Sequence, residues 1–152
     1  MLIYNISIFK TKLGYFELKS IDNKIMSFYP SKKKKIEFNN CYLHKKFYVQ
    51  INKYFNNEKT FLRFNTKMQG TSFQKEVYNK ISKIKFGHTK SYFQIAKELN
   101  TSPRAVGNAC CRNKCLFIVP CHRVICLDGN LGGYILGKKI KRHLINLEKY
   151  GK

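Results

Sequence analysis

The first 55 residues show two different spacings of apolar side chains. Residues 1–30 alternate apolar and polar positions in three short runs, LIYNISIF, GYFELKS and KIMSFYP, separated by polar turns at 12–14 and 22–24. A period of two is typical of half-buried strands, so this stretch predicts an antiparallel meander. Residues 44–55 then place Phe47, Ile51 and Phe55 four apart, which predicts an amphipathic helix. The polar stretch NNEKT follows it and predicts a domain boundary near residues 57–68.

The second half of the chain has the pattern of short helices. Thr71 with Gln74, and Ser91 with Gln94, form two capping-box patterns, each followed by apolar residues at helical spacing. Gly87 is expected to end the first of these helices. Pro103 then opens a third segment, PRAVGNACCR, whose inner face carries small residues and can pack closely against its neighbour. Two short helices joined by about three residues predict a helix-turn-helix, although many helical hairpins bind nothing.

The remaining segments are shorter and less regular. CLFIVP is too short for a typical helix and stops at a proline, so it predicts a buried strand or extended segment. RVICLDGNLGGY contains a turn at 128–130 and paired glycines. KKIKRHLINLEKY predicts a final helix with Ile140, Leu144 and Leu147 on the core side. The N-terminus has no continuous apolar stretch, so we expect neither a signal peptide nor a membrane span. We therefore expect a cytoplasmic protein.

The charge of the chain points to a polyanionic partner. Thirty Lys and Arg face eight Asp and Glu, for a formal net charge of +22 in 152 residues. Such a balance favours nucleic acid binding. Lys, Asn, Ile, Phe and Tyr are all abundant, however, so a coding bias toward AT-rich codons is an alternative source of the lysines. The charge does not locate a binding face.

Five of the six cysteines lie between residues 110 and 126, and several kinds of site are compatible with that cluster. Disulfides are disfavoured without a secretory signal. Structural zinc is a minor alternative, because Cys110 and Cys111 fit a helix face that needs small apolar residues. A catalytic thiol at Cys121 needs a base, and His122 is next to it in VPCHRVIC. Neighbours on an extended chain point to opposite sides, so this pair requires a turn or a bridging water. Glu148 is the acid that can face the histidine from the last helix, but its pattern alone favours a solvated carboxylate.

The motifs together resemble the O6-alkylguanine-DNA alkyltransferases, which repair DNA by direct reversal. PCHR is the most specific signature. GTSFQKEVY, GHTKSYFQIA, RAVGNACCRN, GNLGGY and LINLE match further family motifs in order, over residues 68–150. The first 66 residues match loosely, by size and by strand-then-helix order. The resemblance implies an α/β (α+β) protein with an N-terminal ribonuclease H-like domain, 1–66. A mostly helical, winged helix-turn-helix-like C-terminal domain, 67–152, would bind DNA and hold the active site.

The resemblance also assigns roles to individual residues. Cys121 would accept the alkyl group, with His122 acting on it through a water and Glu148 holding the histidine. Tyr92 would help rotate the damaged nucleotide and donate toward guanine, and Arg104 would enter the duplex in its place. Further DNA contacts are expected from Ser91, Ala105, Asn113 and Arg123. The base pocket would comprise Tyr134, Cys110 and the backbones of Val124 and Ile135.

The expected activity is a single irreversible transfer from O6-alkylguanine, and from O4-alkylthymine, in double-stranded DNA to Cys121. It requires no cofactor and no metal, and the protein is expected to be a monomer that acts without a membrane. The alternative is a non-catalytic lesion-binding helix-turn-helix DNA protein. Relatives that bind lesions without repairing them lack the acceptor cysteine, so the presence of Cys121 argues against this alternative. Lys114 replaces a proline that is common in the family, and we expect it to alter the pocket floor or to add a phosphate contact. Cys110 stands where larger apolar residues are common, so the pocket is expected to be roomier.

Overall fold

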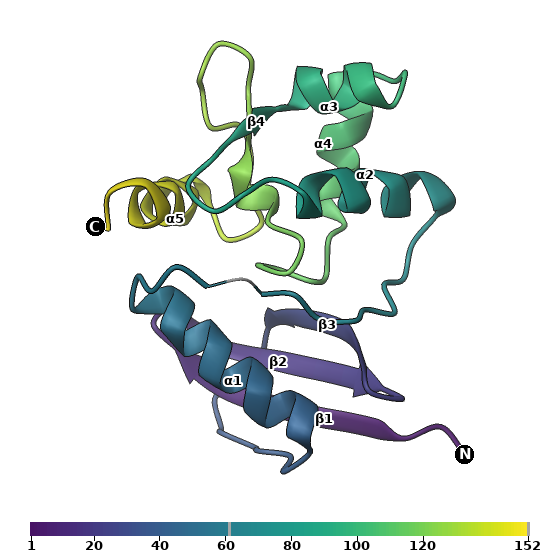
Figure 1. Ribbon diagram of the computed structural model, residues 1–152, viewed down its shortest axis with the longest axis vertical. Helices are drawn as coiled ribbons and strands as arrows, with labels where there is room; N and C mark the ends of the chain where they lie inside the picture. Colours follow the sequence, from purple (N-terminus) through teal and green to yellow (C-terminus); the bar gives the residue numbers. More distant parts are fainter. Residues whose placement is uncertain (61, 152) are drawn as a thin grey trace. The chain divides into compact units, whose positions relative to one another are not determined.

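The computed structural model describes residues 1–60 and 62–151, and its chain forms a mixed α/β protein with two compact units (Figure 1). The first unit comprises Met1–Gln69 together with Lys114–Ile118. The second comprises Gly70–Asn113 and the chain from Val119 onward. The polypeptide therefore leaves the second unit after Asn113, contributes five residues to the first, and returns.

The first unit is built on the meander that the alternating pattern predicts. Strands β1 (Tyr4–Thr11), β2 (Gly14–Ile21) and β3 (Lys24–Pro30) form an antiparallel sheet in that order. Asp22 and Asn23 make the second turn with φ values of +46° and +61°, a conformation that Asn and Asp tolerate better than most residues. Helix α1 (Tyr42–Phe55) starts two residues before the predicted segment and lies against the sheet (Figure 1).

An aromatic cluster joins the sheet to the helix in this unit. The ring of Phe28 on β3 lies 4.7 Å from that of Phe47 on α1 and 5.0 Å from that of Phe16 on β2, measured between centroids. All three side chains are buried. Burying one such ring contributes roughly 1.5–3 kcal/mol, so the four-residue spacing in the sequence corresponds to the main stabilising face of α1.

The segment CLFIVP does not form a full strand. The Phe28 amide donates to the carbonyl of Lys114 at 2.9 Å, and the Leu116 amide donates to the carbonyl of Phe28 at 3.0 Å. This makes an isolated parallel bridge at the edge of β3. The ring of Phe117 then enters the aromatic cluster, 5.4 Å from that of Phe55. The segment is buried and extended at its start, as predicted, but its partners belong to the N-terminal unit.

The second unit contains four helices and a short parallel pair of strands. Its helices are α2 (Ser72–Ser82), α3 (Tyr92–Glu98), α4 (Pro103–Cys111) and α5 (Lys138–Tyr150). Strand β4 (Lys90–Ser91) pairs in parallel with β5 (Val124–Ile125). A 3₁₀ turn, η1 (Cys121–Arg123), precedes β5. Within the described residues, no helix is both long and apolar enough to cross a membrane.

The capping signals in the sequence are confirmed at three helix starts. Thr71 and Ser91 accept hydrogen bonds from the amides of Gln74 and Gln94, and both glutamines complete the capping box. Pro103 occupies the first turn of α4 behind the cap Ser102. The expected end of α2 at Gly87 is wrong, because the helix stops at Ser82 and the chain turns toward β4 before reaching that glycine.

Helices α3 and α4 form the predicted helix-turn-helix. Residues 99–102 connect them. Val106 and Ala109 are buried on the inner face of α4, and a Cβ added to Gly107 would lie 4.0 Å from the ring of Tyr92. The small residues therefore allow the close approach that the sequence predicts. Ala105 and Cys110, expected on the same face, stay partly exposed.

A buried histidine stabilises the interior of the first unit. His44 on α1 lies between Ser7 and Ser20 of the sheet, with Nδ1 2.6 Å from one hydroxyl and Nε2 2.9 Å from the other. All three side chains are fully buried. Burial lowers the pKa of His44 to about 4, so the imidazole is neutral at pH 7. The structure therefore places His44 in the core of the first unit.

We expect this histidine to make stability depend on pH between 6.5 and 4. The unfolded chain binds a proton at His44 below about pH 6.5 and the folded chain only below about 4. The free energy of unfolding should therefore fall, by at most about 1.4 kcal/mol per pH unit, as pH drops through this window. His44→Leu should lose about 1–3 kcal/mol at pH 7, because two buried hydroxyls lose their partner. The variant should also lose this dependence of the free energy of unfolding on pH, which urea titrations at several pH values measure. An equal dependence on pH in both proteins would contradict the assignment.

Candidate active site

Cys121 and His122 share a tight turn rather than an extended segment. The Cys121 amide donates to the carbonyl of Val119 at 2.8 Å, and the Arg123 amide donates to that of Pro120 at 2.9 Å. This closes the 3₁₀ turn η1 directly after the proline. Because the backbone turns here, the two neighbouring side chains are not forced to opposite sides. The turn that the pairing required is therefore present.

Asn113 holds the cysteine from the end of α4. Its Nδ2 donates to the carbonyl of Val119 at 2.9 Å and to Cys121 Sγ at 3.2 Å. The asparagine is 1% exposed and Cys121 is 3% exposed, so both hydrogen bonds are shielded from solvent. A hydrogen bond donated to sulfur favours the thiolate. Asn113 therefore both fixes the turn and stabilises charge on Sγ.

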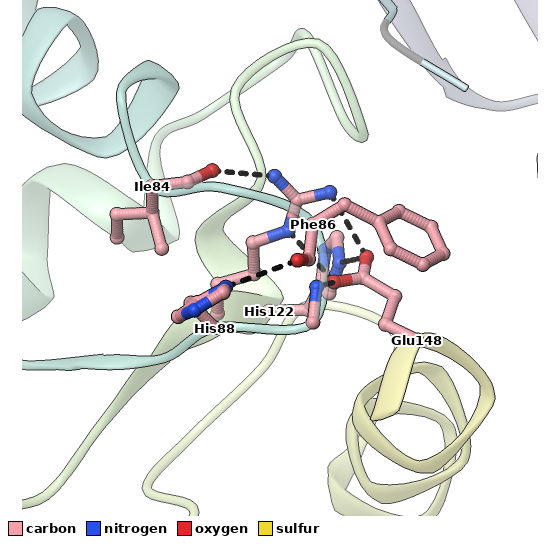
Figure 2. A network of polar contacts seen from close by, with 7 residues as sticks. Ile84, Phe86, His88, His122 and Glu148 are labelled. Atoms are coloured by element: carbon pink, nitrogen blue, oxygen red, sulfur yellow. Dashed lines mark hydrogen bonds and ion pairs between the residues drawn. The ribbon is translucent and has the colours of Figure 1, made fainter. Parts of the chain in front are cut away.

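Glu148 connects helix α5 to the turn η1 and to the loop after α2 (Figure 2). Its Oε1 lies 2.6 Å from His122 Nε2, and Arg123 donates to both carboxylate oxygens at 2.9 and 3.1 Å. The Gly87 amide donates to Oε2 at 3.1 Å. Arg123 also donates to the carbonyl of Ile84 at 2.6 Å. The solvated-carboxylate interpretation of Glu148 is thus wrong: the side chain is buried and accepts four hydrogen bonds.

The hydrogen bonds of Glu148, and not the end of a helix, explain why position 87 is a glycine. Its φ is +77°, and an added Cβ would lie 3.2 Å from the backbone oxygen of Glu148. A side chain at this position would therefore combine an unfavourable backbone conformation with a tight contact to α5. The glycine lets the backbone approach closely enough for its amide to reach the carboxylate.

Burial and charge set the protonation states in this site. Burial raises the pKa of the Cys121 thiol to about 11, partly offset by the hydrogen bond from Asn113 and the charge of Lys141. Burial lowers the pKa of His122, while Glu148 opposes that shift. For Glu148, burial alone would raise the pKa, but hydrogen bonds and charge from His122 and Arg123 dominate and lower it to about 2. At pH 7 the site therefore holds a thiol, a neutral imidazole and a carboxylate.

A cavity of about 570 Å³ opens beside the thiol. Its wall is formed by the start of α3, by α4 and by the loop after β5, and it includes Tyr92, Arg104, Cys110, Cys121, Tyr134 and Ile135. The Tyr134 ring lies 6.3 Å from that of His122. Gly132, with φ +67°, lies so close to Tyr92 that an added Cβ would be 3.0 Å from its ring. The cavity is large enough for a purine base with an alkyl substituent.

Lys141 is a buried residue of this site that the sequence analysis missed. Its Nζ donates to Tyr92 Oη at 3.2 Å and to the carbonyls of Leu131 and Gly133. The side chain is fully buried, and burial lowers the pKa of its ammonium group. The signal was available in the sequence, since residues 141, 144 and 148 share one face of a helix by their spacing of three and four.

The structure places some of the expected site residues in the cavity wall, some behind it, and the others in neighbouring elements. Tyr92, Arg104, Cys110, Tyr134 and Ile135 line the cavity with Cys121, whereas His122, Glu148 and Asn113 lie behind it. Val124 is buried in β5, and Ser91 caps α3. Arg123, for which a DNA contact is expected, has its guanidinium on Glu148 and the Ile84 carbonyl, with its side chain 11% exposed.

The other cysteines are free thiols. Cys110, Cys111 and Cys126 share the cavity wall with Cys121, while Cys115 is buried in the first unit. In the part of the chain that the structure describes, no three or more His, Cys, Asp or Glu side chains are grouped so as to hold a metal ion. Four of the five clustered cysteines thus lie in the wall of one cavity.

Comparison with known proteins identifies the family. Residues 72–150 match the sequence model described as 6-O-methylguanine DNA methyltransferase, DNA binding domain. A methylated-DNA–protein-cysteine methyltransferase of Saccharolobus solfataricus is 35% identical, with 97% of this chain and 96% of that protein covered. One from Methanocaldococcus vulcanius is 49% identical over 82 residues, which are 54% of this chain and half of that relative.

Solved structures give the same result for the fold. The crystal structure of Mycobacterium tuberculosis OGT in complex with DNA has a TM-score of 0.84 and 30% identity, covering 93% of this chain and 91% of that one. The O6-methylguanine methyltransferase of the same organism has a TM-score of 0.79 and 31% identity, with 98% and 93% covered. This chain belongs to the 6-O-methylguanine DNA methyltransferase family.

Proposed function

We propose that this protein repairs DNA by direct reversal, moving an alkyl group from O6 of guanine to its own Cys121. One observation carries the proposal. The Cys121 thiol lies at the wall of a base-sized cavity, accepts a hydrogen bond from Asn113, and adjoins the buried His122–Glu148 pair. An alkyl group on guanine O6 lies inside the base stack, so the base must leave the helix to reach such a thiol.

The first step is removal of the thiol proton. A thiol with a pKa of about 11 is almost entirely protonated at pH 7, so it needs a base. The Glu148 carboxylate only accepts hydrogen bonds, so His122 donates to it from Nε2 and presents Nδ1 as the basic nitrogen. We infer that Nδ1 takes the proton through one water molecule. Glu148 then stabilises the imidazolium that forms.

The second step is displacement at the alkyl carbon. A bond forms between Sγ and the alkyl carbon while the bond between that carbon and O6 breaks, and the electron pair of the broken bond stays on the guanine. The guanine takes one proton through the Tyr92 hydroxyl, and the proton that His122 took from the thiol replaces it through solvent, so no net charge is left. Burial raises the pKa of Tyr92, so its hydroxyl stays protonated and able to donate to the guanine ring. The product is a thioether, which has no good leaving group. Each protein molecule therefore reacts once.

The DNA-binding part of the proposal rests on the helix-turn-helix. Arg104 is exposed at the start of α4 and also lines the cavity, which suits a side chain that fills the space left by an extruded nucleotide. Ser91, Ala105 and the backbones of Val124 and Ile135 are proposed to contact the duplex or the base, as the family resemblance implies. Lysines elsewhere would add affinity that is independent of DNA sequence.

Finer features of the function are proposals of the same kind. O4-alkylthymine is proposed as a second substrate because it presents an alkyl group at an equivalent exocyclic oxygen. The ribonuclease H-like first domain is proposed to support the second. A cytoplasmic location is proposed from the free thiols, which a reducing compartment maintains. A monomeric state is proposed alongside it. The alternative, a lesion-binding protein without catalysis, predicts that Cys121 stays unmodified.

Intact mass measurement tests the transfer. Incubation with a duplex containing O6-methylguanine should add one methyl group per protein molecule, and Cys121→Ser should add none, because the accepting sulfur is gone. Cys126→Ser is the matched control, since it removes another thiol from the same cavity wall and should still gain one methyl. An unchanged mass of the unaltered protein would support the non-catalytic alternative.

Replacing Arg104 separates DNA handling from chemistry. Arg104→Ala should slow repair of a methylated duplex at least tenfold, because the side chain that occupies the vacated stack is lost. Transfer from free O6-benzylguanine should stay within about twofold, since no duplex is opened. Both rates can be measured by intact mass. An equal loss on both substrates would contradict the role.

Replacing Glu148 tests the relay through its pH dependence. Glu148→Gln should lower the transfer rate to Cys121 at least tenfold at pH 7, because the imidazolium loses its counter-charge. Glu148 raises the pKa of His122, so the acid limb of the rate profile should also move to lower pH in the variant. A purely structural role would leave that limb in place. Circular dichroism of the variant checks that it is folded.

A further inference from the structure

A second recess in the same unit is lined by basic side chains. It encloses about 320 Å³ between the end of α2 and the start of α3. Its wall comprises Lys80, Lys83, Ile84, Lys85, His88, Thr89, Lys90 and Gln94. Four ammonium groups and an imidazole around one hollow create a positive potential that favours an anion. We propose that this recess binds backbone phosphates of the DNA that flanks the damaged base.

Two of these lysines are held in place by a carboxylate. Glu98 on α3 pairs with Lys80 of α2 at 3.2 Å and also pairs with Lys90 of β4. These contacts fix the relative positions of the lysine side chains, and they neutralise one of the charges. Lys83 and Lys85 are exposed at the rim. They supply the charge that an incoming phosphate would meet first.

The position of the recess beside the first helix of the helix-turn-helix selects DNA phosphate as the ligand. The first helix of such a motif crosses the backbone while the second enters the groove. Here the first helix is α3, whose opening turn places Tyr92 and Phe93 on the cavity and Gln94 on the recess, just after Lys90. The cavity and the recess thus adjoin consecutive residues at the start of α3, close enough for a duplex that delivers a base to one to present a neighbouring phosphate to the other.

The loop that carries the recess is anchored from its other side. The carbonyl of Ile84 accepts from Arg123, and the amide of Gly87 donates to Glu148 (Figure 2). The lysines thus project from a backbone that the buried network already orders. Ordering a phosphate-binding loop in advance reduces the entropy lost on binding, which favours a site over a merely diffuse charge.

The salt dependence of DNA binding tests this inference. The choice of DNA as the ligand rests on the proposed function, but the measurement itself does not require alkyl transfer. Binding of an undamaged 16-base-pair duplex is followed by fluorescence anisotropy between 50 and 200 mM salt, with unaltered protein and with Lys83→Gln/Lys85→Gln. Two phosphate contacts contribute about 1.8 to the slope of log affinity against log salt. The unaltered protein should therefore lose about tenfold more affinity than the variant across this range.

Matched controls separate a site from general charge. Lys75→Gln/Lys149→Gln removes two exposed lysines on α2 and α5 away from the recess and should leave the slope within about 0.5 of the unaltered value. Equal slopes for the two double variants would overturn the proposal. So would a recess variant that weakens binding to heparin or single-stranded RNA but leaves the duplex slope unchanged.

A second readout distinguishes this inference from the proposed function. The recess variant should transfer the benzyl group from free O6-benzylguanine to Cys121 at the unaltered rate, because Lys83 and Lys85 do not line the reaction cavity. If the unaltered protein transfers no alkyl group, the proposed function fails, and the slope measurement still decides whether the recess binds duplex phosphate.

Discussion

The buried carboxylate of Glu148 is the contact on which the active site depends. It comes from the last helix, and it binds the histidine and arginine of η1 together with the backbone of the loop after α2. A buried carboxylate is expensive unless its oxygens are satisfied, and here four hydrogen bonds satisfy them. The same contacts that make its burial tolerable also set the orientation of His122. Stability and catalytic geometry are thus consequences of one network.

A second constraint is the close packing around the cavity. Glycines at 107 and 132 allow Tyr92 to lie between α4 and the loop after β5, and Lys141 fixes its hydroxyl from below. The ammonium group of Lys141 is buried, and three hydrogen bonds to oxygen atoms replace its contacts with water. An ammonium group under an otherwise apolar cavity also favours negative charge on the nearby thiol. The charge of Lys141 therefore partly offsets the cost of forming a thiolate at the buried Cys121.

The sequence predicted much of the local structure for identifiable physical reasons. Capping boxes at Thr71 and Ser91 are short-range hydrogen-bond patterns, so their residues are close in sequence and can be recognised there. The meander was predictable because its turns require polar residues between alternating runs. One expectation failed where the deciding partner is distant in sequence. Gly87 was assigned to a helix end, although its conformation is required by Glu148, sixty-one residues away.

By itself the sequence determined the order of elements, the helix starts, the family to which the motifs point, and the identity of Cys121, His122 and Glu148 as candidates. These depend on residue types and short spacings. The tertiary structure decided that Glu148 is buried rather than solvated, that Arg123 pairs with it, and that Lys141 lies beneath the cavity. Whether a charged side chain is buried depends on which oppositely charged or polar groups the fold brings to it, and those groups lie tens of residues apart along the chain.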